Sequence, residues 1–349
     1  MTIFDRSAPF PTPFCRRLGL TAPVVQAPVG SAATPELASA VSNAGGLGML
    51  ALSWTPPGSV REQIRATRAL TDRPFGVNVV LEWDQHERVR ACLEESVAVV
   101  STFWGDPGPH VDAIHAGGAL HAHTVGCAEE ARRAVDAGVD VIVAQGWEAG
   151  GRVWGEVATL ALVPAVVDAV APVPVIAAGG VADGRGLAAV LALGADAGWV
   201  GTRFLLAHEA SVHAAWRRRI QDASETSTLY STLFDRGWPD APARTLRNST
   251  VRAWERAGRP AAPGRPGEGD VVARAPDGSR LYRYGPTPAV GGATGDVEAL
   301  ALYAGQGAGI VKDFLPAAAI VEELCSGAAE ALTRRYAGRM SSTLRRDAA

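Results

Sequence analysis

Three apolar segments that end in glycine are the part of this sequence most directly tied to chemistry. VIVAQG at residues 141–146 leads into the loop EAGG at 148–151, and the later segments are VPVIAAGG at 173–180 and AGWVGT at 197–202. Glycine has no β-carbon, so its backbone N–H group can approach an anion closely. A single Gly-Gly pair would usually be only a tight turn, but glycine tips on the last two strands of an α/β barrel favour phosphate binding. We therefore predict a phosphate site at four residues: Gly179, Gly180, Gly201 and Thr202.

Two amide side chains are also expected at strand ends. Asn78 lies in the apolar segment GVNVV, and Gln145 ends VIVAQ. A buried amide needs hydrogen-bond partners, and the polar edge of a heteroaromatic ring would supply them. The alternative for each is an amide satisfied within the protein core. The strand ends as a set are polar and nearly uncharged, which suits a neutral ring and does not suit a metal ion, since a metal would need clustered His, Asp or Glu.

His121 and His123 are the candidates for proton transfer. They alternate along one predicted strand and therefore project to the same side of it. If that side is the barrel interior, either histidine could act as a general base near neutral pH. If it is the exterior, both pack against helices. We favour the interior and leave open which of the two is the base.

The composition excludes several classes of chemistry and partner. Lys312 is the only lysine, so catalysis through a lysine Schiff base is disfavoured. The formal net charge of −3 gives no general attraction for nucleic acid or for an anionic membrane. The N-terminal sequence does not resemble a signal peptide, no apolar stretch is long enough to span a bilayer, and the four cysteines are scattered. We therefore expect a cytoplasmic protein with no nucleic-acid or membrane partner.

Short apolar segments alternate with Ala/Leu/Val-rich segments, the pattern of repeated βα units. Strands are predicted at about residues 23–27, 47–52, 76–80, 97–101, 119–124, 139–144, 173–178 and 197–201. Helices are predicted between them, near residues 34–44, 58–70, 84–95, 108–117, 127–137, 159–171 and 183–193. No dinucleotide-binding glycine fingerprint follows the first strand. The pattern therefore predicts an α/β fold of the (β/α)8 TIM barrel type rather than an open sheet.

The chain loses this alternation after residue 204. Residues 205–299 are rich in Arg and polar residues, with a Pro/Gly cluster at 258–269, and are too long for an ordinary loop. We predict an inserted small domain there, partly helical at 208–222, that covers the active-site face of the barrel. Residues 1–204 and 300–336 would form the barrel with its returning helices, and residues 337–349 a frayed tail.

Taken together, these motifs resemble the nitronate monooxygenases, formerly called 2-nitropropane dioxygenases. The segments that carry the resemblance are QAPVGSAATPELASAVSNAGGLGML, FGVNVV, HTVGCAEEARRAVDAGVDVIVAQGWEAGG, VPVIAAGGVADGRGLAAVLALGADAGWVGTRF and YAGQGAG. They are spread over essentially the whole chain. FMN-dependent enoyl-acyl-carrier-protein reductases share the same barrel, so the motifs are more specific for a flavoprotein barrel than for a substrate.

The resemblance implies an FMN cofactor whose phosphate binds the backbone of Gly180, Gly201 and Thr202. It further implies that the flavin ring lies against Ala27 and Pro28, that Asn78, Gln145 and Gly150 lie near its polar edge, and that Gln306 and Gly307 close the site. Gly151 is also expected to bind the cofactor. The implied reaction is oxidation of an alkyl nitronate through the flavin, with O2 as the electron acceptor.

One departure from the family pattern concerns the residue after EAGG. The family commonly has a histidine there, whereas this chain has Arg152, followed by Val153 and Trp154. Arginine does not accept a proton at neutral pH, so base chemistry would have to move to His121 or His123. Arg152 could instead bind an anion, such as a nitronate, a carboxylate or the phosphate of a nicotinamide cofactor. The alternative is that it faces solvent or forms an ion pair with Glu148 or Glu156.

Two other functions remain open at the level of the sequence. One is an NAD(P)H-dependent flavin reductase of enoyl-type double bonds, in which Arg152 would grip a phosphate. The other is a flavin-binding protein with little turnover. The physiological substrate and the redox partner are not fixed by the sequence, and a homodimer is compatible with it.

Overall fold

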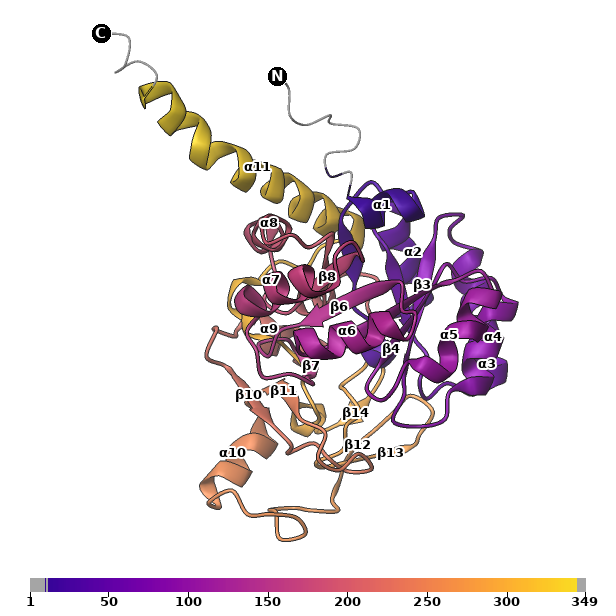
Figure 1. Cartoon of the computed structure of the whole chain (residues 1–349). Coiled ribbons are helices and arrows are strands. Elements are labelled where there is room, and N and C mark those ends of the chain that lie inside the picture. The colour runs from indigo at the N-terminus through magenta and orange to yellow at the C-terminus, as the bar shows by residue number, and fades with distance from the viewer. Residues whose placement is uncertain (1–9, 11, 344–349) are drawn as a thin grey trace.

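The computed structural model describes residue 10 and residues 12–343, and it contains a closed barrel of eight parallel strands. The strands are β1 (Val24–Gln26), β2 (Gly48–Ala51), β3 (Phe75–Val80), β4 (Val99–Phe103), β5 (Leu120–Val125), β6 (Val141–Gln145), β8 (Val175–Ala178) and β9 (Ala197–Val200). Neighbouring strands pair around the ring, and a parallel bridge between Val25 and Leu47 joins β1 to β2 and closes it. The predicted TIM barrel is confirmed, and every predicted strand overlaps an observed one (Figure 1).

Helices that follow the strands form the outer layer of the barrel. They are α2 (Pro35–Asn43), α3 (Pro57–Arg68), α4 (His86–Glu94), α5 (Gly108–Ala116), α6 (Ala128–Asp136), α7 (Thr159–Val170) and α8 (Gly184–Ala192). Polar side chains start some of them. Thr34 accepts the Leu37 N–H at the start of α2, and Asp183 accepts two N–H groups at the start of α8. These capping hydrogen bonds fix the residue at which each strand-to-helix loop ends. The loops contribute residues to the site described below.

The amino end of the barrel is closed by α1 (Pro13–Leu18). Its Phe14 is fully buried in the same apolar cluster as Val99, Val141 and Ala197, which are the first residues of β4, β6 and β9. The barrel interior is therefore packed with side chains at this end, and the opposite end is left to the site.

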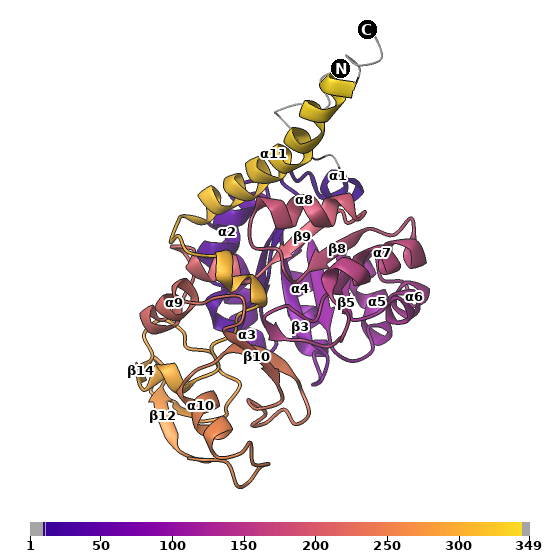
Figure 2. The same cartoon turned by 90° about the vertical axis from the view of Figure 1, so that its left-hand side faces the viewer.

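After β9 the chain forms short elements beside the barrel (Figures 1 and 2). They are η2 (Thr202–Leu206), α9 (Ala214–Gln221), β10 (Thr228–Ser231), β11 (Ala243–Leu246), α10 (Ser249–Arg256), β12 (Val271–Arg274), β13 (Arg280–Tyr282), β14 (Thr294–Gly295), η3 (Val297–Ala299) and η4 (Gln306–Ile310). One three-stranded sheet has the order β13-β12-β14. The other, β10-β11-β7, includes β7 (Gly151–Arg152) from the loop after β6, which ties that loop to the later segment.

The helix α9 lies within the segment predicted to be partly helical. Phe234 and Leu281 of the later segment belong to the same buried apolar cluster as Leu162 of α7 and Leu187 of α8. The segment therefore packs on the barrel through shared apolar contacts, and its division from the barrel as a separate domain stays a prediction.

The last helix, α11 (Ala317–Thr343), returns to the barrel and lies along α8 (Figures 1 and 2). A β-carbon added to Gly184 would come within 2.5 Å of the Gly327 backbone, so glycine at this contact lets the two helices approach closely. The described helix continues beyond residue 336, where we expected the tail to begin, and residues 344–349 lie outside the described residues. None of the described helices is both long and apolar enough to cross a bilayer.

Candidate active site

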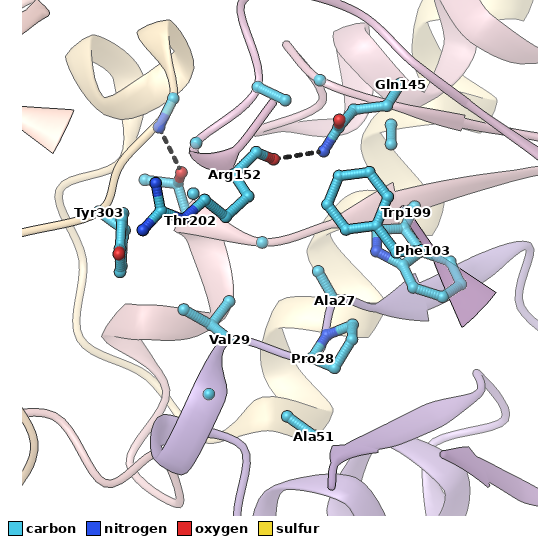
Figure 3. Close-up of a pocket in the computed structure, with 18 of the residues that line it drawn as sticks. Ala27, Pro28, Val29, Ala51, Phe103, Gln145, Arg152, Trp199, Thr202 and Tyr303 are labelled. Atoms are coloured by element: carbon cyan, nitrogen blue, oxygen red, sulfur yellow. Dashed lines mark hydrogen bonds between the residues drawn. The ribbon is translucent and has the colours of Figure 1, made fainter. Parts of the chain in front are cut away.

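A cavity opens at the carboxyl ends of the barrel strands, where the site was predicted (Figure 3). Many predicted site residues line it: Ala27, Pro28, Asn78, Gln145, Gly150, Gly151, Arg152, Gly179, Gly180, Gly201, Thr202 and Gly307. Three others do not line it: His121, His123 and Gln306. The later segment contributes Trp238, Pro286 and Pro288, so it forms part of the cavity wall.

The ends of β8 and β9 form a cradle of backbone N–H groups, which we define by Gly180, Gly201 and Thr202. Within the described part of the chain, none of these three N–H groups donates a hydrogen bond to the protein. Gly180 has φ +73°, a left-handed conformation that favours glycine. A β-carbon added to Gly201 would have its nearest neighbour at 3.5 Å, on Ala27, so the space beside this backbone is open. Because the groups are unpaired donors at adjacent strand ends, the cradle suits a phosphate group.

Thr202 and the 303–307 segment hold the cradle in place. The Thr202 Oγ1 accepts the Gly305 N–H at 2.9 Å (Figure 3). The Gln306 N–H donates to the Glu148 carbonyl at 3.1 Å. A β-carbon added to Gly150 would lie 2.4 Å from the Gly305 nitrogen. Gly150 therefore permits a close contact between the loop after β6 and the 303–307 segment. Gln306 contributes to this contact through its backbone N–H group.

The two amides have different surroundings. Asn78 is only 7% exposed and lines the cavity, and its side chain has no hydrogen-bond partner among the described residues. It is thus a buried polar group still in need of a partner, which fits the polar edge of a ring. Gln145 is already engaged: its Nε2 donates to the Arg152 carbonyl at 3.0 Å (Figure 3). Its Oε1 accepts the Trp154 N–H at 3.3 Å. Gln145 therefore positions the loop that carries Arg152.

Arg152 is held by the later segment of the chain. Its Nη2 donates to the Phe234 carbonyl at 2.8 Å, its Nη1 donates to the Ala241 carbonyl, and its guanidinium lies 4.7 Å from the centre of the Trp238 ring. Neither of the ion pairs given as the alternative for Arg152, with Glu148 or with Glu156, is present. The side chain is half-buried, and no carboxylate among the described residues forms an ion pair with it. Arg152 thus places a positive charge in the cavity wall.

His121 and His123 lie on the outer side of β5, so the prediction that they project into the barrel is wrong. Residues alternate along a strand, and the intervening Ala122 belongs to the interior cluster while Thr124 lines the cavity. Both histidines contact the Thr102 hydroxyl, at 2.9 Å from His121 Nε2 and 2.8 Å from His123 Nδ1. Burial lowers the pKa of His121 to about 3 and that of His123 to about 4. Neither is placed to act as the base in the cavity.

Several lining residues were not predicted from the sequence. Five of them are aromatic: Trp54, Phe103, Trp199, Trp238 and Tyr303. Tyr303 directly precedes AGQG, a segment that carries the family resemblance, so that motif could have indicated it. Trp238 is contributed by the later segment, and no local pattern connects it to the barrel. No group of three or more His, Cys, Asp or Glu side chains in the described chain is arranged to hold a metal ion.

We predict that the buried histidines destabilise the protein in acid. In the unfolded chain a histidine binds a proton near pH 6.5, whereas the folded chain holds the pKa of His123 at about 4. Unfolding therefore takes up a proton, and the free energy of unfolding falls as the pH is lowered from about 6.5 towards 4. Urea denaturation across this range should show a smaller fall in His123→Gln, while His208→Gln, a change at an exposed histidine, should follow the wild type. Identical pH dependence in wild type and His123→Gln would contradict the prediction.

The chain is similar to several known proteins. Residues 13–327 match the family model for nitronate monooxygenase. The (3aS,4S,5R,7aS)-5-hydroxy-7a-methyl-1-oxo-octahydro-1H-indene-4-carboxyl-CoA dehydrogenase of Mycobacterium tuberculosis is 39% identical over 251 residues, which cover 71% of this chain and 69% of that protein. The nitronate monooxygenase of Pseudomonas aeruginosa is 33% identical, with 89% of this chain and 97% of that protein covered. The nitroalkane oxidase structure from Streptomyces ansochromogenes has a TM-score of 0.75 at 31% identity, covering 92% of this chain and 99% of that one.

The family match extends over the barrel, the cavity and the small sheets that border it. It agrees with a cavity whose wall offers unpaired backbone donors and an unpaired amide side chain. The chain therefore belongs to the nitronate monooxygenase family and is a flavin-dependent oxidoreductase.

Proposed function

We propose that this protein is an FMN-dependent enzyme that oxidises alkyl nitronates with O2 as the electron acceptor. The observation that carries the proposal is the chemistry of the cavity wall. Among its described lining residues, only Arg152 and Tyr303 have titratable side chains, and neither is a base at neutral pH. A nitronate is already deprotonated at carbon, so its oxidation needs no proton abstraction, whereas a neutral nitroalkane would need a base.

FMN fits the residues present. Its phosphate would be bound by the N–H groups of Gly180, Gly201 and Thr202, and the Asn78 amide would pair with the polar edge of its ring. Ala27 and Pro28 would supply apolar contact with the ring. When bound, the flavin supplies the capacity to take electrons from a substrate and deliver them to O2.

Arg152 and Tyr303 would act on the substrate without changing their charge. Burial raises the pKa of Tyr303, and its hydroxyl donates to the Pro286 carbonyl at 2.7 Å, so it is a neutral, fixed group. Arg152 is positively charged and has no carboxylate partner among the described residues. A charge held in a partly buried wall attracts an anion more strongly than one in water. We therefore assign Arg152 the role of drawing a nitronate into the cavity.

A second candidate function is dehydrogenation of an acyl-CoA, the activity named for the Mycobacterium tuberculosis relative. One observation favours it. Arg236 and Arg280 line a groove that shares Pro286 with the main cavity, and neither forms an ion pair among the described residues. Exposed arginines beside the cavity could hold the phosphates of such a carrier. Reduction of the protein-bound flavin by an acyl-CoA substrate and not by a nitronate would select this candidate.

Anaerobic reduction tests the leading proposal. Propyl 1-nitronate should bleach the flavin absorption band as it passes electrons to the flavin, and air should restore the band. Neutral 1-nitropropane at pH 7 should react at least about 100-fold more slowly, because the cavity offers no base and catalysis by a general base contributes roughly 100-fold or more. NADH and NADPH should leave the band unchanged. Bleaching by a nicotinamide cofactor but not by the nitronate would replace this proposal with a reductase.

Substitution of Gly180 tests the cradle. Gly180→Val places a branched side chain beside the phosphate donors and strains a backbone at φ +73°, so the purified protein should lose its flavin. Gly258→Val is a matched control, because Gly258 has φ +81° and lies exposed after α10, away from the cavity. The control carries similar backbone strain and should keep a full complement of flavin. Retention of flavin by Gly180→Val would show that the phosphate binds elsewhere.

A further inference from the structure

Five tryptophans gather on one side of the cavity mouth, and we call them the indole wall: Trp54, Trp83, Trp104, Trp154 and Trp238. The first four come one each from the loops that follow β2, β3, β4 and β6. Trp238 comes from the segment between β10 and β11. Segments far apart in the sequence thus converge on one aromatic surface.

Trp238 forms the centre of the wall. Its ring centre lies 4.9 Å from that of Trp83, 5.0 Å from Trp104 and 6.3 Å from Trp54, all in edge-to-face contact. Trp154 meets Trp104 at 4.6 Å. Such contacts each add a favourable interaction beyond simple burial, so the rings hold one another in fixed orientations. The guanidinium of Arg152 lies against Trp238 as well, which connects the wall to the charged side chain in the cavity.

The wall is open to solvent although it is apolar. Trp54 is 58% exposed, Trp154 38% and Trp83 36%, whereas Trp238 at the centre is 3% exposed. Grouped exposed aromatic side chains are uncommon on a soluble protein unless something binds there. Trp104 also has φ +63°, a strained conformation for a bulky residue, and such strain concentrates at functional sites.

The wall adjoins the active site, and two of its loops, those after β3 and β4, lie across the barrel from the cradle. Trp54, Trp238 and the neighbouring Phe103 line the same cavity as Gly180 and Gly201. In the strand order around the barrel, β3 and β4 are diametrically across from β8 and β9. A substrate that reacts in the cavity would therefore extend its remote part away from the phosphate end and towards the wall.

We propose that the indole wall binds an apolar ring carried by the substrate, so that ring-bearing nitronates are preferred over short alkyl ones. This inference rests on the function proposed above. A flat ring can stack on the exposed face of Trp54 or contact it edge-on. This contact needs no hydrogen bonds, and the only hydrogen-bond donors of these side chains are their indole N–H groups. A short alkyl chain would leave the wall exposed to water. Arg152 and the wall would then recognise the two ends of one substrate, the anionic head and the apolar ring.

The test compares two probes, propyl 1-nitronate and the nitronate of 2-phenylnitroethane. Wild-type enzyme should show a kcat/KM at least about tenfold higher for the phenyl probe, mainly through a lower KM. Trp54→Ala should reduce this preference to within about twofold, and Trp54→Phe should keep most of it, because the ring is retained. Leu160→Ala, at a side chain that is 72% exposed on α7 and outside the cavity, should match the wild type.

Three outcomes would overturn the inference: no preference in the wild type, a preference that survives in Trp54→Ala, or equal loss of both probes in Trp54→Ala and Trp54→Phe. If the wild type holds flavin but oxidises neither nitronate, the proposed function fails independently. Binding is then measured directly by quenching of tryptophan fluorescence with the same two probes. Tighter binding of the phenyl probe that is lost in Trp54→Ala supports the wall as a ring site, and equal binding of both probes rejects it.

Discussion

The pairing of β8 with β9 is the constraint on which the rest of the site depends. Parallel register places Ala178 beside Trp199, so the two chains leave the barrel at the same level and turn side by side. The residues that follow, Gly180 and Gly201, then line one cavity, and their N–H groups have no acceptor among the described residues. Barrel closure through the Val25–Leu47 bridge fixes this geometry, because β1 must pair with β9 as well as approach β2. The proposed anion site would thus be a consequence of the barrel itself.

Arg152 gives the loop after β6 both a structural role and an electrostatic role. Its backbone extends the small sheet through β7, its carbonyl accepts from Gln145, and its side chain donates to two carbonyls of the later segment. A histidine at this position could not make both of those side-chain contacts, since an imidazole has no forked pair of donors. Arginine at this position holds the loop in place, but it does not supply a base to the cavity. A cavity of this kind suits a substrate that arrives as an anion.

Much of the barrel was predictable because the signal is local. Apolar strands and amphipathic helices alternate with regular spacing, and the glycine tips of β8 and β9 are visible in the sequence. The side of β5 occupied by His121 and His123 was not predictable, because alternation shows that two residues share a side and does not show which side it is. The indole wall was missed for another reason. Trp54 and Trp238 are 184 positions apart and meet only through tertiary packing. Whether residues 205–299 form a separate domain stays a prediction.

The central claim is that backbone N–H groups at the ends of β8 and β9 bind the phosphate of the cofactor. It is tested most directly by comparing FMN with riboflavin, which has the same ring and no phosphate. Equilibrium titration of the flavin-free protein should give a dissociation constant for FMN at least about 100-fold lower than for riboflavin. This ratio corresponds to a difference in binding free energy of about 2.7 kcal/mol, which is the scale of two charge-assisted hydrogen bonds. Equal dissociation constants for the two flavins would contradict the claim.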